Sequence, residues 1–113
     1  MKNCIFCKIA AGEIPSNKVY EDDQVLAFYD LNPAAKVHIL VIPKMHIANV
    51  MEISENNSAL IAHIFEVIAK LAKDLNLQEG FRVVSNCNAY GGQSVFHLHF
   101  HLLGGEQLSM NMC

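Results

Sequence analysis

The sequence predicts an α+β fold, in which a five-stranded antiparallel sheet packs against one long helix and a short N-terminal helix. One segment alone carries a long helical repeat of apolar residues, whereas five short segments have the composition of strands. The connections between the strand segments are mostly short, which favours antiparallel pairing. With 113 residues, 52% of them hydrophobic, the chain is expected to form a single domain spanning residues 1–113.

The first half of the chain supplies the short helix and three strands. Apolar residues in segment 4–12 have the spacing of a short amphipathic helix, and residues 14–17 form a turn signal. Residues 18–21 and 25–29 read as a hairpin. Residues 37–42 form a strongly apolar strand that stops at Pro43.

The second half supplies the long helix and two strands. The helix is predicted over residues 57–75, with Ser54 as a candidate N-cap and Gly80 beyond its end. Its apolar face recurs at steps of three and four residues, at Leu60, Ile64, Val67, Ile68, Leu71 and Leu75. Strands are predicted over residues 81–85 and 96–103, joined by a polar connection that contains glycines.

Charge and hydropathy exclude several classes of partner. The chain has 8 Lys+Arg against 11 Asp+Glu, so no broad basic surface for long nucleic acid is expected, although a single nucleotide needs only a local site. No apolar run approaches the roughly 20 residues of a membrane span, and the N-terminus lacks the apolar stretch of a secretory signal. We therefore expect a cytoplasmic protein without a membrane partner, whose cysteines are reduced thiols or metal ligands.

Three histidines alternate with apolar residues near the C-terminus, at His97, His99 and His101. On a strand their side chains share one face, with neighbouring rings rooted about 6.6 Å apart. Gly91-Gly92-Gln93-Ser94 precedes them and offers backbone amides and a hydroxyl to an anion. A phosphate site with a built-in nucleophile is the favoured interpretation. A single such histidine would more often be an ordinary polar residue, and a zinc site is the main competitor, although three rings on one strand do not easily reach one ion.

At this point the chain resembles a known family. The segment His97-Leu98-His99-Phe100-His101-Leu102-Leu103 is similar to the histidine triad motif of the histidine triad (HIT) nucleotide-binding proteins, and most similar to their Hint branch. The likeness extends over nearly the whole chain, and its other motifs are Cys4-Ile5-Phe6-Cys7-Lys8-Ile9, Ala27-Phe28-Tyr29-Asp30-Leu31-Asn32-Pro33, His38-Ile39-Leu40-Val41-Ile42-Pro43-Lys44 and Gly91-Gly92-Gln93-Ser94-Val95-Phe96-His97.

The resemblance implies a function and an assembly. It implies a homodimer whose two sheets join into one, with a purine nucleotide (AMP or GMP) bound to each protomer. It also implies a hydrolase that cleaves the P–N bond of purine nucleoside phosphoramidates through a covalent nucleotidyl-histidine intermediate. Two alternatives stay open, namely a hydrolase of dinucleoside polyphosphates and a non-catalytic nucleotide-binding scaffold.

The resemblance also implies roles for individual residues. His99 would be the nucleophile, His97 would support it by hydrogen bonding, and His38 would stand behind them. His101 and Ser94 would contact phosphate oxygens or the departing amine. Around the nucleotide, Asp30 would take the ribose hydroxyls, Asn86 and Gln93 would lie at the phosphate, and the base would sit among Ile5, Phe6, Ile9, Phe28 and Leu40. Without the resemblance, Asp30 reads as a turn residue and the apolar set as ordinary core.

Cys4 and Cys7 have the spacing of metal ligands but make only half a zinc site. In some similar proteins the histidines matching His46 and His97 complete it, which implies a closed structural zinc that takes no part in the chemistry. The alternative is two reduced thiols in a short helix. Cys87 and Cys113 read as unrelated to this set, and His63 as a surface or packing residue. The tail from Glu106 onward lacks the Trp-Pro-Pro-Gly stretch frequent in the family, which leaves the leaving group of the substrate open.

Overall fold

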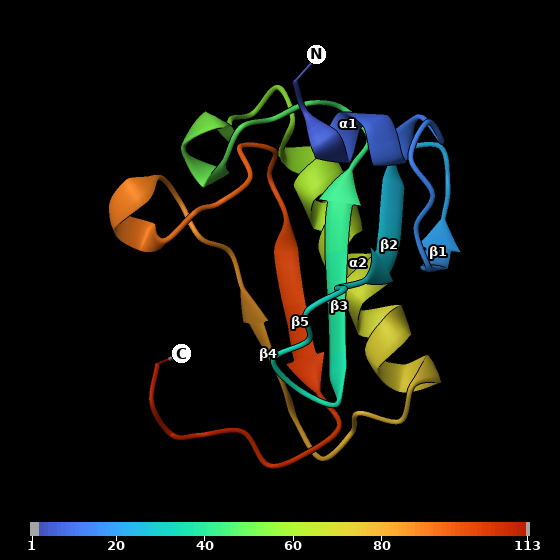
Figure 1. Cartoon of the computed structure of the whole chain (residues 1–113), viewed down its shortest axis with the longest axis vertical. Coiled ribbons are helices and arrows are strands. Elements are labelled where there is room, and N and C mark those ends of the chain that lie inside the picture. The colour runs from blue at the N-terminus through green and yellow to red at the C-terminus, as the bar shows by residue number, and fades with distance from the viewer. Residues whose placement is uncertain (1–2, 113) are drawn as a thin grey trace.

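The computed structural model describes residues 3–112, and Met1, Lys2 and Cys113 lie outside them. The chain runs through α1 (Ile5–Ala10), β1 (Lys18–Glu21), β2 (Val25–Tyr29), β3 (Val37–Pro43), α2 (Ser58–Asp74), β4 (Phe81–Val84) and β5 (Phe100–Gly104), with two short 3₁₀ turns at Val50–Glu52 and Ala89–Gly91 (Figure 1). All strand pairs are antiparallel, and the five strands stand in the order β1-β2-β3-β5-β4. The predicted α+β architecture is therefore confirmed.

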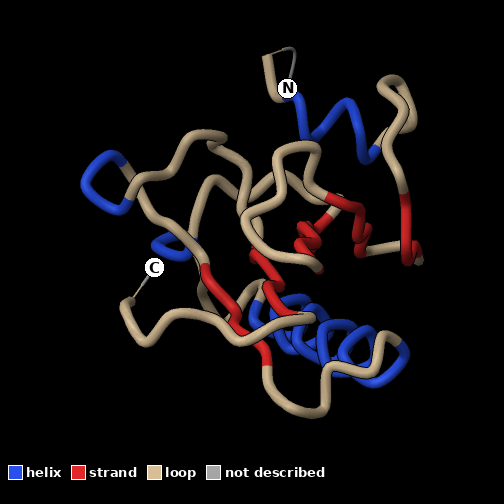
Figure 2. The backbone as a smooth tube through the Cα atoms, turned by 60° about the horizontal axis from the view of Figure 1, so that its bottom comes forward, coloured by secondary structure: helices blue, strands red, loops and turns tan. Residues whose placement is uncertain are grey.

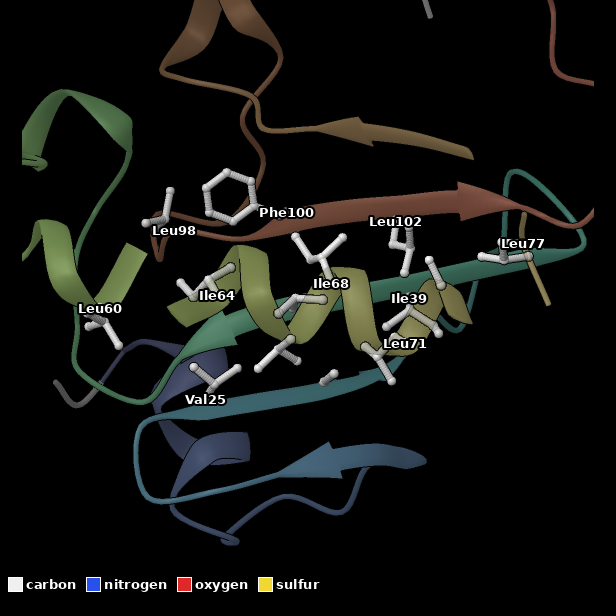
Figure 3. Close-up of a cluster of buried hydrophobic side chains, with 14 of the residues drawn as sticks. Val25, Ile39, Leu60, Ile64, Ile68, Leu71, Leu77, Leu98, Phe100 and Leu102 are labelled. Carbon is white, nitrogen blue, oxygen red and sulfur yellow. The ribbon is translucent and has the colours of Figure 1, made fainter. Parts of the chain in front are cut away.

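The two helices lie on opposite faces of the sheet. Helix α2 runs along one face, while α1 crosses the other face near one end of β2 and β3 (Figures 1 and 2). Between α2 and the sheet lies the larger core, to which Leu98, Phe100 and Leu102 contribute from the β5 side (Figure 3). The face of α2 that is buried there consists of Leu60, Ile64, Val67, Ile68, Leu71 and Ala72, close to the periodic set seen in the sequence.

A smaller apolar cluster covers the opposite face of the sheet, under α1. Its buried members are Phe6, Ile9, Leu26, Phe28, Leu40 and Ile42. Because side chains alternate along β3, Leu40 and Ile42 point to this face while Ile39 and Val41 point to α2. His38 shares the face of Leu40, so this is the side of the sheet on which the site forms.

The N-cap of α2 differs from the sequence prediction. Asn57, and not Ser54, precedes the helix, while the Ser54 hydroxyl accepts a hydrogen bond from the Asn56 amide in the turn before it (3.2 Å). The helix ends at Asp74, and Asn76 after it takes a positive φ of 59°; Gly80 lies beyond the end, as predicted. No helix within residues 3–112 is both long and apolar enough to cross a membrane.

The last strand begins four residues later than predicted, at Phe100 rather than Phe96. The Leu98 amide donates to the Ile47 carbonyl (2.6 Å), so this segment pairs with the chain that follows β3 and leaves the sheet ladder. Alternation of the faces nevertheless persists: Leu98 and Phe100 lie in the α2 core, whereas the rings of His97 and His99 contact Phe6 of α1. The premise that all three histidines lie on one regular strand is therefore wrong, although their common side of the sheet is correct.

Candidate active site

His99 is held with one ring nitrogen occupied and the other free. It lies just before β5, and its Nδ1–H donates to the backbone carbonyl of His97 (2.7 Å). In the neutral ring Nε2 then carries the lone pair, and this atom has no hydrogen-bond partner within residues 3–112. Within residues 3–112, Ser16 Oγ is the only solvent-inaccessible side-chain nitrogen or oxygen that lacks a hydrogen-bond partner. Because His99 Nε2 also lacks a partner and is not such an atom, it is accessible to solvent.

The ring and the backbone of His99 are fixed from two further sides. The Phe6 ring packs edge-on against the imidazole, with centroids 5.1 Å apart and planes at 88°. The Ser85 hydroxyl donates to the His99 carbonyl (3.0 Å) at the point where β4 and β5 separate. Sequence reasoning missed Ser85, and the antiparallel register of β4 and β5 was the signal that could have found it.

His38 and His101 form a chain of hydrogen bonds with a defined direction. The Ala34 amide donates to His38 Nδ1 (2.9 Å), so the proton of neutral His38 is on Nε2, which donates to His101 Nδ1 (2.9 Å). The proton of His101 is therefore on Nε2, where it can be donated to a ligand. The rings of His99 and His101 are adjacent, with centroids 5.1 Å apart.

Burial keeps this pair uncharged at neutral pH. Burial lowers the pKa of His101 to about 4, and positive charge on His99 or His38 would lower it in the same direction. Burial also lowers the pKa of His38, against the opposing effect of the Asp30 carboxylate. Both rings are thus neutral hydrogen-bonding groups at neutral pH.

Asp30 has the turn role expected from the sequence alone, and it also approaches His38. One carboxylate oxygen accepts from the Asn32 amide (2.8 Å), as in an ordinary turn, and the other lies 3.4 Å from His38 Nε2. The carboxylate is one-fifth exposed. Asp30, His38 and His101 also lie close enough together to hold a metal ion. The proton on His38 Nε2 points into that space, however, so this trio is arranged for hydrogen bonding.

The apolar residues assigned to the base pocket come together only in part. Phe6, Ile9, Phe28 and Leu40 belong to the cluster under α1, with Phe6 and Phe28 in edge-to-face contact at 5.7 Å. Ile5 does not join this cluster and is 48% exposed. An apolar wall therefore stands directly beside His99, on the side where α1 crosses the sheet.

The glycine-containing loop before the histidines is organised by Gln93. Its side-chain amide donates to the carbonyls of Ala48 (2.7 Å) and Val95 (3.0 Å), and its oxygen accepts from the Asn88 amide (2.8 Å) and from Asn49 Nδ2 (3.3 Å). Because both ends of the buried amide are used, Gln93 shapes the loop and its side chain is not free for a ligand.

Asn86 and Ser94 lie at the two ends of this loop. Asn86 Nδ2 donates to the Gly91 carbonyl (2.8 Å), which leaves its side-chain oxygen free among the described residues. Ser94 is exposed and lines a surface hollow together with Cys4, His46 and Phe96.

Two thiols and two imidazoles lie close together at the N-terminal end of α1. One ligand atom from each of Cys4, Cys7, His46 and His97 lies within 4.8 Å of the others. His97 Nδ1 is 3.3 Å from Cys4 Sγ and 3.4 Å from Cys7 Sγ, and His46 Nδ1 is 3.2 Å from Cys7 Sγ. We call these four residues the Cys/His cluster.

The Cys/His cluster fits a tetrahedral Zn²⁺ ion. His97 Nε2–H donates to the Pro43 carbonyl (2.7 Å), which leaves the Nδ1 lone pair directed at the two sulfurs, as in zinc-bound histidines. Burial raises the pKa of the Cys7 thiol to about 11, as does its hydrogen bond with Cys4, so without a cation Cys7 stays a neutral thiol. Burial likewise lowers the pKa of His97.

His97 therefore contributes to the two parts of the site with different atoms. Its fully buried ring belongs to the Cys/His cluster and makes no hydrogen bond to His99. The support expected from His97 comes from its backbone carbonyl instead. The sequence could not separate these two contributions because both require the same residue.

A five-stranded antiparallel sheet that presents three histidines, each with a defined hydrogen-bonding role, next to an apolar wall defines a histidine triad protein. Residues 11–108 match the HIT domain, and the chain belongs to the HIT family. Relatives cover almost all of the chain. An uncharacterized HIT-like protein of Synechococcus elongatus is 49% identical over 108 residues, with 96% of this chain and 95% of that protein covered.

Solved structures of similar proteins have the same fold. A histidine triad protein from Clostridium difficile is 55% identical, with a TM-score of 0.93 and 96% of both chains covered. A HIT family hydrolase from Clostridium thermocellum is 48% identical, with a TM-score of 0.96, and the match covers all of this chain and 99% of that one.

Proposed function

We propose that this protein is a purine nucleoside phosphoramidase that uses His99 as its nucleophile. The observation that carries the proposal is the state of the His99 ring, whose Nδ1–H is engaged by the His97 carbonyl while Nε2 is free. A scaffold that only binds a nucleotide has no need of a ring held in this way. The name of the Clostridium thermocellum relative, a HIT family hydrolase, supports an enzyme.

In the proposed first step, the Nε2 lone pair of His99 attacks the phosphorus atom and the P–N bond breaks. The departing nitrogen keeps the bonding electron pair and takes up a proton from solvent, while the neutral His101 Nε2–H can offer it only a hydrogen bond. The nucleotidyl-imidazole that forms carries a positive charge, which the Nδ1–H bond to the His97 carbonyl stabilises. In the second step, water attacks phosphorus and gives up a proton to solvent, while the P–N bond to His99 breaks, its Nε2 regains the lone pair and the nucleotide is released.

The site suits a nucleoside monophosphoryl group. No Lys or Arg follows Arg82 in the sequence, so phosphate oxygens would be met by the His101 Nε2–H, the Ser94 hydroxyl and backbone amides. Asp30 would accept from the ribose hydroxyls, and the base would contact the wall formed by Phe6, Ile9, Phe28 and Leu40.

A substrate panel tests this proposal. Amine-linked phosphoramidates of AMP and GMP, together with a dinucleoside polyphosphate, are offered to wild-type protein and to His99→Ala. We expect turnover of the phosphoramidates by the wild type, and loss of turnover with retained binding of AMP in the variant. Preferential cleavage of the dinucleoside polyphosphate would favour that alternative, and full activity of His99→Ala would refute the proposed nucleophile.

We also propose that the Cys/His cluster binds Zn²⁺. The ligands would be the two sulfurs and the Nδ1 atoms of His46 and His97, a closed set with no position left for substrate. A bound ion would supply folding free energy and keep both thiols deprotonated. Elemental analysis of purified protein should find one zinc ion per chain, and its absence from protein prepared with zinc would refute the site.

Finally, we propose that two copies pair through β4. The two edges of the sheet are β1 and β4. Strand β1 carries the exposed charges of Lys18 and Glu21, which discourage edge pairing, whereas β4 begins at the half-exposed Phe81. Pairing at β4 would extend one sheet across the homodimer.

A further inference from the structure

The Cys/His cluster and the nucleophile are directly connected. His97 places its ring in the cluster and its carbonyl on His99 Nδ1 (2.7 Å), so one residue belongs to both. A second connection is Phe6, which lies on α1 between the two cysteines. Its ring contacts both imidazoles edge-on, at 6.0 Å from His97 and 5.1 Å from His99.

The side chains of His97 and Phe6 are both tightly packed and have little room to move. The His97 ring is fully buried and is anchored on its far side by the Pro43 carbonyl at the end of β3. Phe6 is 7% exposed and is packed against Phe28. A rotation of the His97 ring away from the two sulfurs would therefore carry its backbone or the Phe6 ring with it.

We propose that the Cys/His cluster is a positioning device for His99, so that metal bound by these four residues holds the His97 carbonyl and the Phe6 ring where the nucleophile needs them. This inference rests on the proposed function for its kinetic readout. It goes beyond a zinc ion that merely ties α1 to the sheet, since it makes His97 and Phe6 positioning residues whose geometry depends on the state of the cluster.

The physical reason is the weakness of the cluster without a cation. Its sulfur and nitrogen atoms then interact only through hydrogen bonds that involve thiols, which are weak donors and acceptors. Metal–ligand bonds would replace these contacts with directional ones. Because the His99 tautomer depends on a single bond to the His97 carbonyl, loosening that carbonyl allows the proton to move to Nε2 and removes the nucleophilic lone pair.

The first measurement compares zinc-loaded and metal-free wild-type protein. We expect the kcat for adenosine phosphoramidate hydrolysis to fall about tenfold to hundredfold on metal removal, with little change in KM, because the effect acts on the nucleophile and not on the nucleotide contacts. The second measurement is independent of activity. Ring ¹⁵N–¹H NMR should show His99 protonated at Nδ1 in loaded protein and a mixture of tautomers, or a shifted and broadened signal, in metal-free protein.

One variant removes a ligand while every residue of α1 and His97 itself stay unchanged, although the His46 ring that contacts Cys7 and His97 is lost. In His46→Asn, cobalt binding, followed by the thiolate-to-cobalt absorption, should be weaker, and added Co²⁺ or Zn²⁺ should restore both kcat and the His99 signal. This rescue separates positioning by the metal from a folding defect, and it keeps the test valid should metal-free wild type unfold. The matched control is Cys87→Ser, a free cysteine outside the cluster, which should change neither readout.

Two results would overturn the inference. One is a metal-free protein, or an unloaded His46→Asn, whose His99 signal and kcat equal those of the loaded wild type. The other is a chain that takes up neither Zn²⁺ nor Co²⁺. If loaded wild type turned over no phosphoramidate, the proposed function would fail, while the NMR comparison would still decide whether the cluster positions His99.

Discussion

Which ring nitrogen carries the proton decides what each histidine of the site can do. His97 and His38 are protonated on Nε2. His101 is also protonated on Nε2, because its Nδ1 accepts the hydrogen bond from His38. Of these four histidines, His99 alone is protonated on Nδ1. Among these four histidines, the middle member of the motif is therefore the one whose Nε2 carries a lone pair. Residue type selects this chemistry, but three backbone groups, the carbonyls of Pro43 and His97 and the amide of Ala34, set the tautomers.

Ser85 offers a test at this scale. In Ser85→Ala the His99 carbonyl loses its hydroxyl partner, so we expect unfolding by urea to show a loss of about 1 kcal/mol and kcat to fall with KM unchanged. Ser16→Ala is the matched control, since the Ser16 hydroxyl oxygen is buried with no hydrogen-bond partner among residues 3–112, and its removal should cost no stability. Equal behaviour of the two variants would contradict the role given to Ser85.

The lowered pKa of His101 predicts that the free energy of unfolding decreases at acid pH. Because the pKa of His101 is lowered from 6.5 to about 4 in the folded protein, the unfolded chain binds more protons between these values. Stability should therefore fall as the pH drops from 6.5 towards 4. Urea unfolding across this range should show a smaller fall for His101→Asn, and a parallel fall in both proteins would argue against a neutral, buried His101.

At the scale of elements, His63 of α2 connects this helix to the β1–β2 turn through a hydrogen bond with Asp22. Its Nε2 lies 2.6 Å from the Asp22 carboxylate, which also accepts from Tyr20 (2.7 Å), and its Nδ1 lies 3.3 Å from Glu66. The hydrogen bond with Asp22, and secondly that with Glu66, raises the pKa of His63. Burial alone would raise the pKa of Asp22, but its hydrogen bonds outweigh burial and hold it well below its usual range. His63 thus lies on α2 as the surface or packing residue that the sequence suggested, and its contacts with Asp22 and Glu66 were not predicted.

This contact gives a pH dependence of opposite sign to that of His101. A pKa raised above 6.5 in the folded state means that the stabilisation is fully present below 6.5 and is lost as the pH rises through the folded pKa. We expect the stability difference between wild type and His63→Gln, measured by urea unfolding, to be larger at about pH 6 than at about pH 9. Lys70→Gln, which alters an exposed pair on α2, should show no such change. A difference independent of pH would rule out a charged His63.

The sequence predicted elements well where local pattern determines them. The periodicity of α2 and the apolar strands β2 and β3 required no knowledge of the rest of the chain. Residues 96–99 have strand composition, yet they leave the ladder because Leu98 pairs with Ile47 and Gln93 ties the preceding loop to Ala48. Those contacts join segments about 45 to 50 residues apart, so no local pattern could reveal them. The same holds for the division of His97 between ring and carbonyl.

For the molecule as a whole, the arrangement of strands predicts how copies assemble. In light scattering we expect twice the mass of the 12.6 kDa chain, and a monomer for Phe81→Glu, which places a charge at the exposed start of β4. A charge-removing change on the other edge, Lys18→Gln, should leave the dimer intact. A wild type that is monomeric at micromolar concentration, or a dimer unaffected by Phe81→Glu, would contradict pairing through β4.

The two faces of the sheet carry different parts of the molecule, the large core on one and the candidate site on the other. The α2 face holds the large apolar core, and the opposite face holds the histidines, the apolar wall and the Cys/His cluster. A stable core on one side allows several buried polar groups on the other, at a cost in stability that the pH dependence of His101 should make visible.

The central claim is that His99 Nε2 forms a covalent bond to phosphorus. The most direct measurement mixes the protein with an adenosine phosphoramidate, quenches within one turnover, and maps the modified peptide by mass spectrometry under conditions that preserve phosphohistidine. We predict an adenylyl group on His99 in the wild type and none in His99→Ala. An adduct on another residue, or steady turnover by the wild type with no adduct at any quench time, would contradict the account.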